Sequence, residues 1–166
     1  PLAPNVAPGN GYVGVMLPYT PLHELLFSDL GAGAPLDVLV MTSGNYASEP
    51  IVTNNDAALA HLAALADAFL LHDREIYVPC DDSVLRVCDA QELPLRRSRG
   101  YAPFPVKLPF ALRPTLALGG ELKATFCLVK DEHALLSQHL GDMENLETLA
   151  ALQHAVTHFR ALFRTE

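Results

Sequence analysis

The sequence predicts an α/β protein in which strands and helices are followed, after a proline-rich connection, by a hairpin and a long helix. Short apolar runs alternate with segments of helical periodicity, which favours this class. One apolar run ends in a Thr-Ser-Gly-Asn turn at residues 42–45, as a buried strand does when it delivers polar groups to a pocket. The prolines of residues 103–114 predict an extended, semi-rigid connection to a final strand and helix pattern.

The first part of the chain is expected to contain short strands, because apolar runs there are bounded by turn residues. These runs are residues 12–17, 38–41, 69–71, 83–88 and 95–98. The run at 38–41 is expected to be covered on both faces, since it is continuously apolar. The last two runs are expected to pair in antiparallel fashion through a loop at residues 89–94, and another loop is expected at residues 31–35.

Two helices are expected in the same part. Pro21 can occupy the first position of a helix that continues over residues 22–27. Asn54 or Asn55 can cap a second helix, over residues 56–65, by accepting a backbone hydrogen bond. The apolar stripe of the second helix is predicted to consist of Leu59, Leu62 and Leu65.

The second part is predicted to form a hairpin and a long helix. Strands are expected over residues 115–118, 126–129 and 134–137, with Gly119-Gly120 as a tight turn. Asp142 or Asn145 is expected to open a helix that runs to about residue 163. Its buried face is predicted to contain Leu146, Leu149, Leu152, Val156 and Phe159. We therefore divide the chain into residues 1–102, a linker at 103–114, and residues 115–166.

Charge narrows the classes of ligand. The net charge of −8 argues against non-specific nucleic-acid binding, which depends on clustered Lys and Arg. Arg96, Arg97 and Arg99 nevertheless form a local cationic cluster. Such a cluster in an acidic chain suits a small phosphorylated ligand, and a solvated edge strand is the alternative.

The three cysteines include no Cys-x-x-Cys pair, so neither a disulfide framework nor a structural zinc site is expected. Reduced thiols indicate a cytoplasmic protein, and Cys127, inside an apolar run, is expected to be a small core residue. No apolar run approaches the ~20 residues that span a bilayer. Because the chain begins with Pro1 and shows no signal pattern, we expect a soluble fragment of a longer polypeptide.

The Thr-Ser-Gly-Asn turn is one of several unusual segments that occur in a fixed order. The others are residues 13–23, 80–84, 96–103, 118–123 and 136–142. This series resembles HypF, the family of carbamoyltransferases that helps to build the cyanide ligands of nickel-iron hydrogenases. The resemblance runs from about Val13 to the C-terminus. It implies that residues 1–102 are the late part of a YrdC-like domain, a partial twisted mixed sheet with helices, and that residues 115–166 open an actin-like carbamoyltransferase domain.

The resemblance also implies a reaction. Carbamoyl phosphate and ATP would give carbamoyl-adenylate and pyrophosphate, and the carbamoyl group would pass to the C-terminal cysteine of HypE. Such a site must hold a triphosphate and exclude water from a labile mixed anhydride. These residues alone are expected to be inactive or nearly so. Two alternatives remain: an O-carbamoyltransferase of antibiotic tailoring, and a noncatalytic nucleotide- or RNA-binding YrdC-like module, which the acidic charge fits poorly.

The residues implied to bind nucleotide or phosphate are Thr42, Ser43, Asn45, Arg97, Arg99, Gly119 and Gly120. The hydroxyl and amide groups at 42–45 can all point into one concavity, although Ser, Gly and Asn also serve simply to make turns. Alternation along a strand is expected to place Arg97 and Arg99 on one face, with Ser98 on the opposite face.

The implied catalytic residues are Lys123, His139 and Asp142. Lys123 would supply the cation of the phosphate loop, and the other two would lie near the nucleotide. Asp81 and Asp82 can hold Mg²⁺ on the phosphates, with Asp82 as the assigned ligand, or they can stabilise a turn through bonds to the backbone. The resemblance places zinc or another metal only in parts of the family that lie outside these residues.

Overall fold

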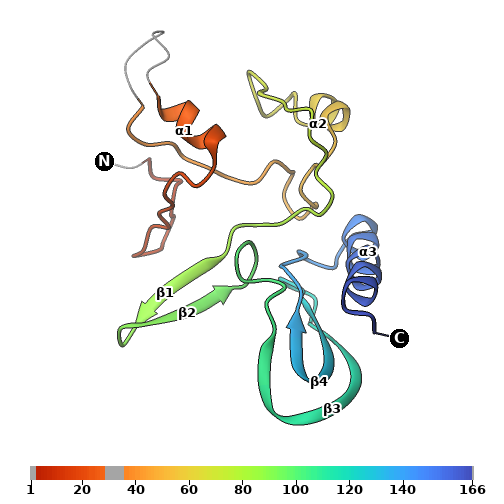
Figure 1. Ribbon diagram of the computed structural model, residues 1–166. Coiled ribbons are helices and arrows are strands. Elements are labelled where there is room, and N and C mark those ends of the chain that lie inside the picture. The colour runs from red at the N-terminus through yellow and green to blue at the C-terminus, as the bar shows by residue number, and fades with distance from the viewer. Residues whose placement is uncertain (1–2, 29–35, 166) are drawn as a thin grey trace. The chain divides into compact units, whose positions relative to one another are not determined.

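The computed structural model describes residues 3–28 and 36–165, so the loop expected at 31–35 lies outside the described residues. Helices and strands follow in the order α1, α2, β1, β2, β3, β4, α3 (Figure 1). The chain divides into two compact units, Pro1–Thr42 and Ser43–Glu166. Helices and antiparallel hairpins together place the described chain in the predicted mixed α/β class.

The first unit contains helix α1, Pro21–Phe27, which begins as predicted with a proline at its start. The hydroxyl of Thr20 accepts a hydrogen bond from the amide of His23 at 3.2 Å and caps the helix. The strands expected at 12–17 and 38–41 are wrong: Val15 is 87% exposed and Val38 is 74% exposed. Neither run pairs with another strand among the described residues of this unit. Without a partner, the backbone N–H and C=O groups of such a run can form hydrogen bonds only with water.

Helix α2, Asn55–His61, opens the second unit's regular structure. The side chain of Asn54 caps it by accepting from the amide of Ala57 at 3.0 Å. The helix ends before the predicted position 65, and the predicted apolar stripe is wrong, because Leu59 is 44% exposed and Leu65 is 59% exposed. The strand expected at 69–71 is also absent from this described segment.

Strands β1, Val84–Cys88, and β2, Gln91–Arg96, form an antiparallel hairpin. The connection is the two-residue turn Asp89-Ala90, whose φ angles of 51° and 61° suit the right-handed twist of a hairpin. The longer loop predicted at 89–94 is therefore wrong. As a consequence, β2 begins earlier than predicted and ends at Arg96.

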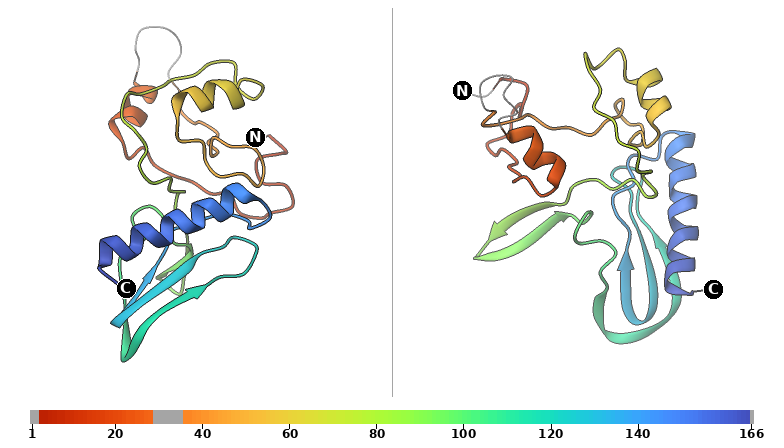
Figure 2. Two further views of the ribbon diagram at one scale, coloured as in Figure 1. Left: turned by 90° about the vertical axis from the view of Figure 1, so that its right-hand side faces the viewer. Right: turned by 45° about the horizontal axis from the view of Figure 1, so that its top comes forward.

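Strands β3, Val106–Leu118, and β4, Phe126–Leu136, form a second and longer antiparallel hairpin. Most of the segment predicted as an extended connection is thus strand. The register shifts between Lys107 and Leu112 and between Leu112 and Thr115. Pro109 and Pro114 lie within these shifts, because proline cannot donate a ladder hydrogen bond. Figures 1 and 2 show β3 curving widely around β4.

The core lies between β4 and helix α3, Leu146–Phe163, which runs along the hairpin (Figure 2). The buried apolar residues of this cluster are Phe126, Leu128, Leu135, Ala155 and Phe159. The rings of Phe126 and Phe159 meet edge to face at 4.9 Å. Cys127 follows Phe126 in β4 and is half-buried. Its burial raises the pKa of the thiol, and a hydrogen bond with the backbone of Leu135 acts in the opposite direction.

The capping residue of α3 is Asn145, one of the two predicted candidates, and it accepts from the amide of Thr148 at 2.8 Å. The predicted buried face is confirmed for Phe159 but wrong for Leu146, which is 78% exposed, and for Leu149. The predicted Leu152 and Val156 are partly buried and pack against the core, and Thr148 and Ala155, which were not predicted, are buried on the same helix.

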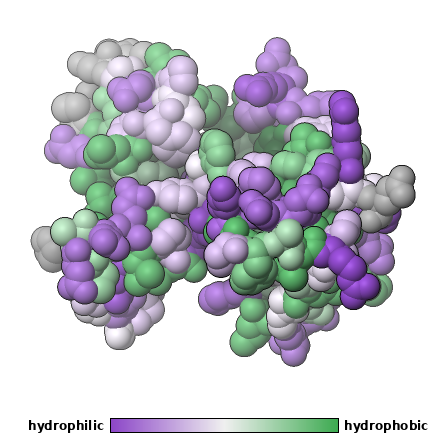
Figure 3. Space-filling model, turned by 60° about the horizontal axis from the view of Figure 1, so that its bottom comes forward, coloured by the Kyte–Doolittle hydropathy of each residue, from purple (hydrophilic) through white to green (hydrophobic). Residues whose placement is uncertain are grey.

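Apolar side chains remain exposed along β3. Figure 3 shows apolar residues interleaved with polar ones on the face of the molecule turned to the viewer. Phe110 is 54% exposed and Leu118 is 62% exposed. Among the described residues, no helix combines the length and apolar character needed to cross a bilayer.

Phe159→Ala should destabilise this chain by about 3 kcal/mol, because it removes a buried ring from the core. Leu146→Ala, on the same helix, should change the free energy of unfolding by less than about 0.5 kcal/mol, because that side chain is exposed. Urea denaturation of both variants measures the difference. A larger loss for Leu146→Ala than for Phe159→Ala would contradict the assigned buried face.

Candidate functional site

The loop that carries Ser43 and Asn45 is fixed by its own backbone. The amide nitrogen Nδ2 of Asn45 donates to the carbonyls of Tyr46 at 2.8 Å and Glu49 at 2.9 Å. Because both partners can only accept, the amide has one possible orientation. Its oxygen Oδ1 is buried and has no hydrogen-bond partner among the described residues. A buried acceptor left open in this way suits a donor group on a ligand. Thr42 belongs to the other unit, and its side chain is exposed.

Hydrogen bonds donated in both directions join residues 80–83 to residues 98–99. The backbone amide of Arg99 donates to the carbonyl of Asp81 at 3.2 Å, and its guanidinium donates to the carbonyl of Cys80 at 2.9 Å. The hydroxyl of Ser83 accepts from the amide of Ser98 at 2.9 Å and donates to the carbonyl of Arg99 at 2.8 Å. The two segments therefore form one rigid unit around the fully buried Ser98.

Arg97 and Arg99 do not share a strand face, so that prediction is wrong; β2 ends at Arg96 and the alternation stops with it. The guanidinium of Arg97 donates to the carbonyls of Tyr101 at 3.2 Å and Phe104 at 3.3 Å. The guanidinium of Arg99 pairs with Asp82 at 3.6 Å. Phosphate binding by these two residues stays a prediction, which would require both groups to exchange partners.

Asp81 and Asp82 point to different partners. Asp82 pairs with Arg99, whereas Asp81 reaches His139. The described residues hold no group of three or more His, Cys, Asp or Glu side chains that could bind a metal. Asp81 and Asp82 therefore do not form one paired-carboxylate group in this structure, and Mg²⁺ binding by Asp82 stays a prediction.

The connection between β3 and β4 covers residues 119–125 rather than a two-residue Gly-Gly turn, which was predicted wrongly. The amide of Gly119 donates to the carbonyl of Thr125 at 2.8 Å. Lys123 has a φ of 53°, and its backbone amide donates to the carboxylate of Asp142 at 2.8 Å. Lys123 and Asp142 thus meet through the backbone of Lys123, and the lysine side chain is exposed.

His139 forms the contact that joins these segments. Its Nδ1 lies 2.7 Å from Oδ2 of Asp81, 58 residues away in sequence. The two side chains are only 17% and 21% exposed. The other ring nitrogen, Nε2, is buried and lacks a hydrogen-bond partner in the described part of the chain. A second link joins the amide group of Asn145 to the carbonyl of Ser48, in the loop of Asn45.

Hydrogen bonds therefore link Asp81 to His139 and to Arg99, and the backbone of Lys123 to Asp142. The contacts of Arg97 lead elsewhere, and a methyl group at Gly120 would meet no atom within 4 Å. Sequence reasoning weighed Asp81 only as a metal ligand or a turn residue and missed it as the partner of His139. Both residues lie in motifs that the sequence singled out, so the motifs could have suggested a pair. Nothing in the spacing of the two motifs indicates which residues meet.

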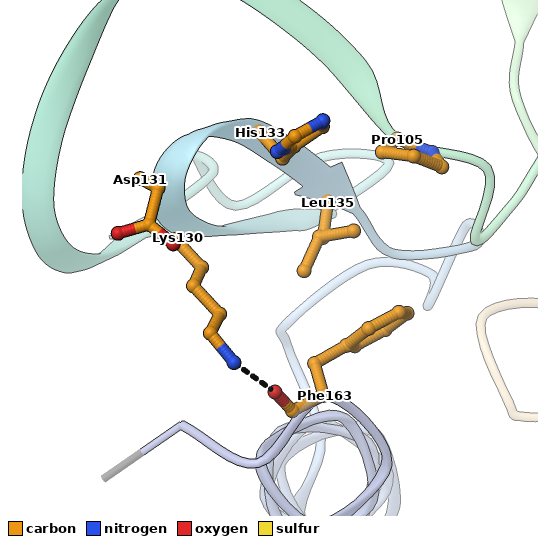
Figure 4. Close-up of a pocket in the computed structure, with 6 residues that line it drawn as sticks. All are labelled: Pro105, Lys130, Asp131, His133, Leu135 and Phe163. Atoms are coloured by element: carbon orange, nitrogen blue, oxygen red, sulfur yellow. Dashed lines mark hydrogen bonds between the residues drawn. The ribbon is translucent and has the colours of Figure 1, made fainter.

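A pocket of about 310 Å³ lies at the other end of the β4 and α3 core (Figure 4). Its lining residues are Pro105, Lys130, Asp131, His133, Leu135 and Phe163. The ammonium of Lys130 donates to the carbonyl of Phe163 at 3.0 Å and so provides a hydrogen-bond partner for a carbonyl at the C-terminal end of α3. None of the predicted site residues lines this pocket.

Two family models match the chain in succession. Residues 1–98 match the family of Sua5, YciO and YrdC, described as telomere recombination, and residues 111–166 match the HypF Kae1-like domain. These matches confirm the predicted order of a YrdC-like part and the start of a Kae1-like, or actin-like, domain. The exact limits of the predicted linker at 103–114 stay a prediction.

Curated relatives match over nearly the whole chain. Carbamoyltransferase HypF2 of Cupriavidus necator is 50% identical and covers 93% of this chain, and carbamoyltransferase HypF of Synechocystis is 46% identical and covers 98%. The chain spans about a fifth of the length of each, 21%.

Solved structures match the fold as well. The crystal structure of HypF from T. kodakarensis has a TM-score of 0.86 and 42% identity, and the match covers 96% of this chain and 20% of that one. A crystal structure of full-length HypF in the phosphate- and nucleotide-bound form has a TM-score of 0.82 and 40% identity, with 93% of this chain and 24% of that one covered.

Gly119 and Gly120 should respond differently to alanine. A methyl group at Gly119 would stand 2.7 Å from the carbonyl oxygen of Thr125, whereas one at Gly120 meets nothing within 4 Å. Gly119→Ala should therefore cost about 1–3 kcal/mol of unfolding free energy, and Gly120→Ala less than about 0.5 kcal/mol. Thermal and urea unfolding measure both. Equal effects would show that the closure of the loop onto Thr125 is not formed.

Proposed function

The chain belongs to the HypF family, and on this premise we propose that it acts as part of a carbamoyltransferase of [NiFe]-hydrogenase maturation. Curated relatives that match nearly the whole chain are named carbamoyltransferases. Because the chain spans 21% of their length, the activity is proposed for a polypeptide of the relatives' size that includes it.

The proposed substrates are carbamoyl phosphate and ATP. Water would cleave carbamoyl phosphate to carbamate and inorganic phosphate, and carbamate would attack the α-phosphate of ATP to give carbamoyl-adenylate and pyrophosphate. The carbamoyl group would then pass to the C-terminal cysteine of HypE. Mg²⁺ would neutralise charge on the triphosphate, with Asp82 as the proposed protein ligand beside the phosphate oxygens. A related structure that contains phosphate and nucleotide supports this substrate class.

The residues of the YrdC-like part would hold the acyl adenylate. Asn45 offers a buried acceptor, Oδ1, without a partner in the described chain, which suits the amino group of a carbamoyl unit. Thr42 and Ser43 would add hydroxyl donors, and the guanidinium groups of Arg97 and Arg99 would bind phosphate oxygens.

In the Kae1-like part, Gly119 and Gly120 would border the phosphates and the exposed ammonium of Lys123 would supply a cation. Asp142 fixes the backbone of Lys123, and His139 would lie beside the reacting group. The observation that carries the proposal is the connected group: His139 contacts the loop of Asp81, which is clamped to Arg99. A transferase that makes an activated acyl group in one part and uses it in another needs such a junction.

The test replaces the matching segment of Cupriavidus necator HypF2 with this chain and measures pyrophosphate release from ATP. The chimera should release pyrophosphate only when carbamoyl phosphate is present. Lys123→Gly should lower that rate by about tenfold or more, because it removes the cation. It should not lower stability, since glycine accepts the φ of 53° at that position.

Lys107→Ala, an exposed lysine of β3, serves as the matched control and should leave the rate unchanged. Release that does not depend on carbamoyl phosphate would reject the proposed function. Transfer of the carbamoyl group to a sugar hydroxyl in place of the thiol would favour an O-carbamoyltransferase. An unchanged rate in Lys123→Gly would reject only the role of that lysine.

A further inference from the structure

The Asp81–His139 contact has the geometry of a carboxylate that orients an imidazole. The 2.7 Å separation of Oδ2 and Nδ1 is a short hydrogen bond. An ionised carboxylate can only accept, so Nδ1 must carry the hydrogen. In a neutral ring, Nε2 then holds the free lone pair and can only accept. Nε2 is also the atom that is buried with no partner among the described residues.

Backbone hydrogen bonds to other residues fix the positions of both Asp81 and His139. The backbone of Asp81 accepts from Arg99 at 3.2 Å. His139 lies between Ser137, whose amide donates to the carbonyl of Phe126 at 2.8 Å, and Leu140, whose amide donates to that of Ala124 at 2.9 Å. The pair therefore has little freedom to reorient, and a fixed ring nitrogen is what a proton acceptor requires.

We propose that Asp81 is a positioning residue for His139, which accepts the proton of the acceptor thiol during carbamoyl transfer. This inference rests on the proposed function. In the step, the acceptor sulfur bonds to the carbamoyl carbon, and the bond from that carbon to the phosphate oxygen of AMP breaks. AMP leaves with the electron pair, and the thiol proton moves to Nε2 of His139.

The chemistry assigns His139 to this step and not to the first one. Carbamate is already an anion, so its attack on ATP releases no proton and needs no base. A thiol, by contrast, has an ordinary pKa of about 8.5 and is mostly protonated near neutral pH. A base within reach of the thiol is therefore required only for transfer.

The test uses the HypF2 chimera and separates the two half-reactions. Adenylate formation is measured as exchange between pyrophosphate and ATP, and transfer as carbamoylation of a peptide that ends in cysteine. Asp81→Asn should keep the exchange rate within about twofold and slow transfer by about tenfold or more. The amide of asparagine can donate to Nδ1, which favours the tautomer with a hydrogen on Nε2.

His139→Gln should show the same split, and the double variant should be no slower than either single one, because the two residues act as a unit. Asp67→Asn removes an exposed carboxylate of the YrdC-like part and should leave both half-reactions unchanged. Equal loss of both half-reactions in Asp81→Asn, or additive losses in the double variant, would overturn the inference. Absence of carbamoyl phosphate-dependent exchange in the unsubstituted chimera would instead reject the proposed function.

Discussion

The hydrogen bond between Asp81 and His139 is the interaction on which the organisation of the candidate site depends. It joins a loop within residues 1–98, which match the YrdC family, to a loop within residues 111–166, which match the Kae1-like domain. Both side chains are largely buried. Loss of one partner would leave the other polar group buried without compensation, which costs more than the bond itself contributes.

The elements around this bond limit where each residue can lie. The hydrogen bonds between residues 80–83 and 98–99 fix Asp81, and the bridge between Ala124 and Gly141 fixes the segment of His139. Asn145 has two functions, since its side chain caps α3 and also donates to the loop of Asn45. The core of β4 and α3 therefore supports the site through the start of the helix, while the pocket at the helix end takes no part in it.

Local chemistry in the sequence located the helix starts and most strands of the two hairpins, but it also predicted strands that do not form. The caps at Thr20, Asn54 and Asn145 depend on residues three positions away, and Pro21 and Asn145 were placed correctly from sequence. Strands depend on distant partners, so apolar runs such as residues 12–17 and 38–41 were wrongly expected to pair. The candidate site shows the same contrast between local motifs, which the sequence reveals, and distant contacts, which it does not. The motifs that contain Asp81 and His139 were recognisable. The two residues are 58 positions apart in sequence, however, and their contact could not be inferred from either motif.

A double-mutant cycle on the free energy of unfolding of this chain tests the junction most directly. Asp81→Ala, His139→Ala and the double variant would be unfolded in urea at neutral pH. If the two side chains interact as described, the cycle should give a coupling free energy of about 1–3 kcal/mol. A coupling near zero would contradict the account, because the two loops would then be stabilised independently and the link between the YrdC-like and Kae1-like parts would have no energetic basis.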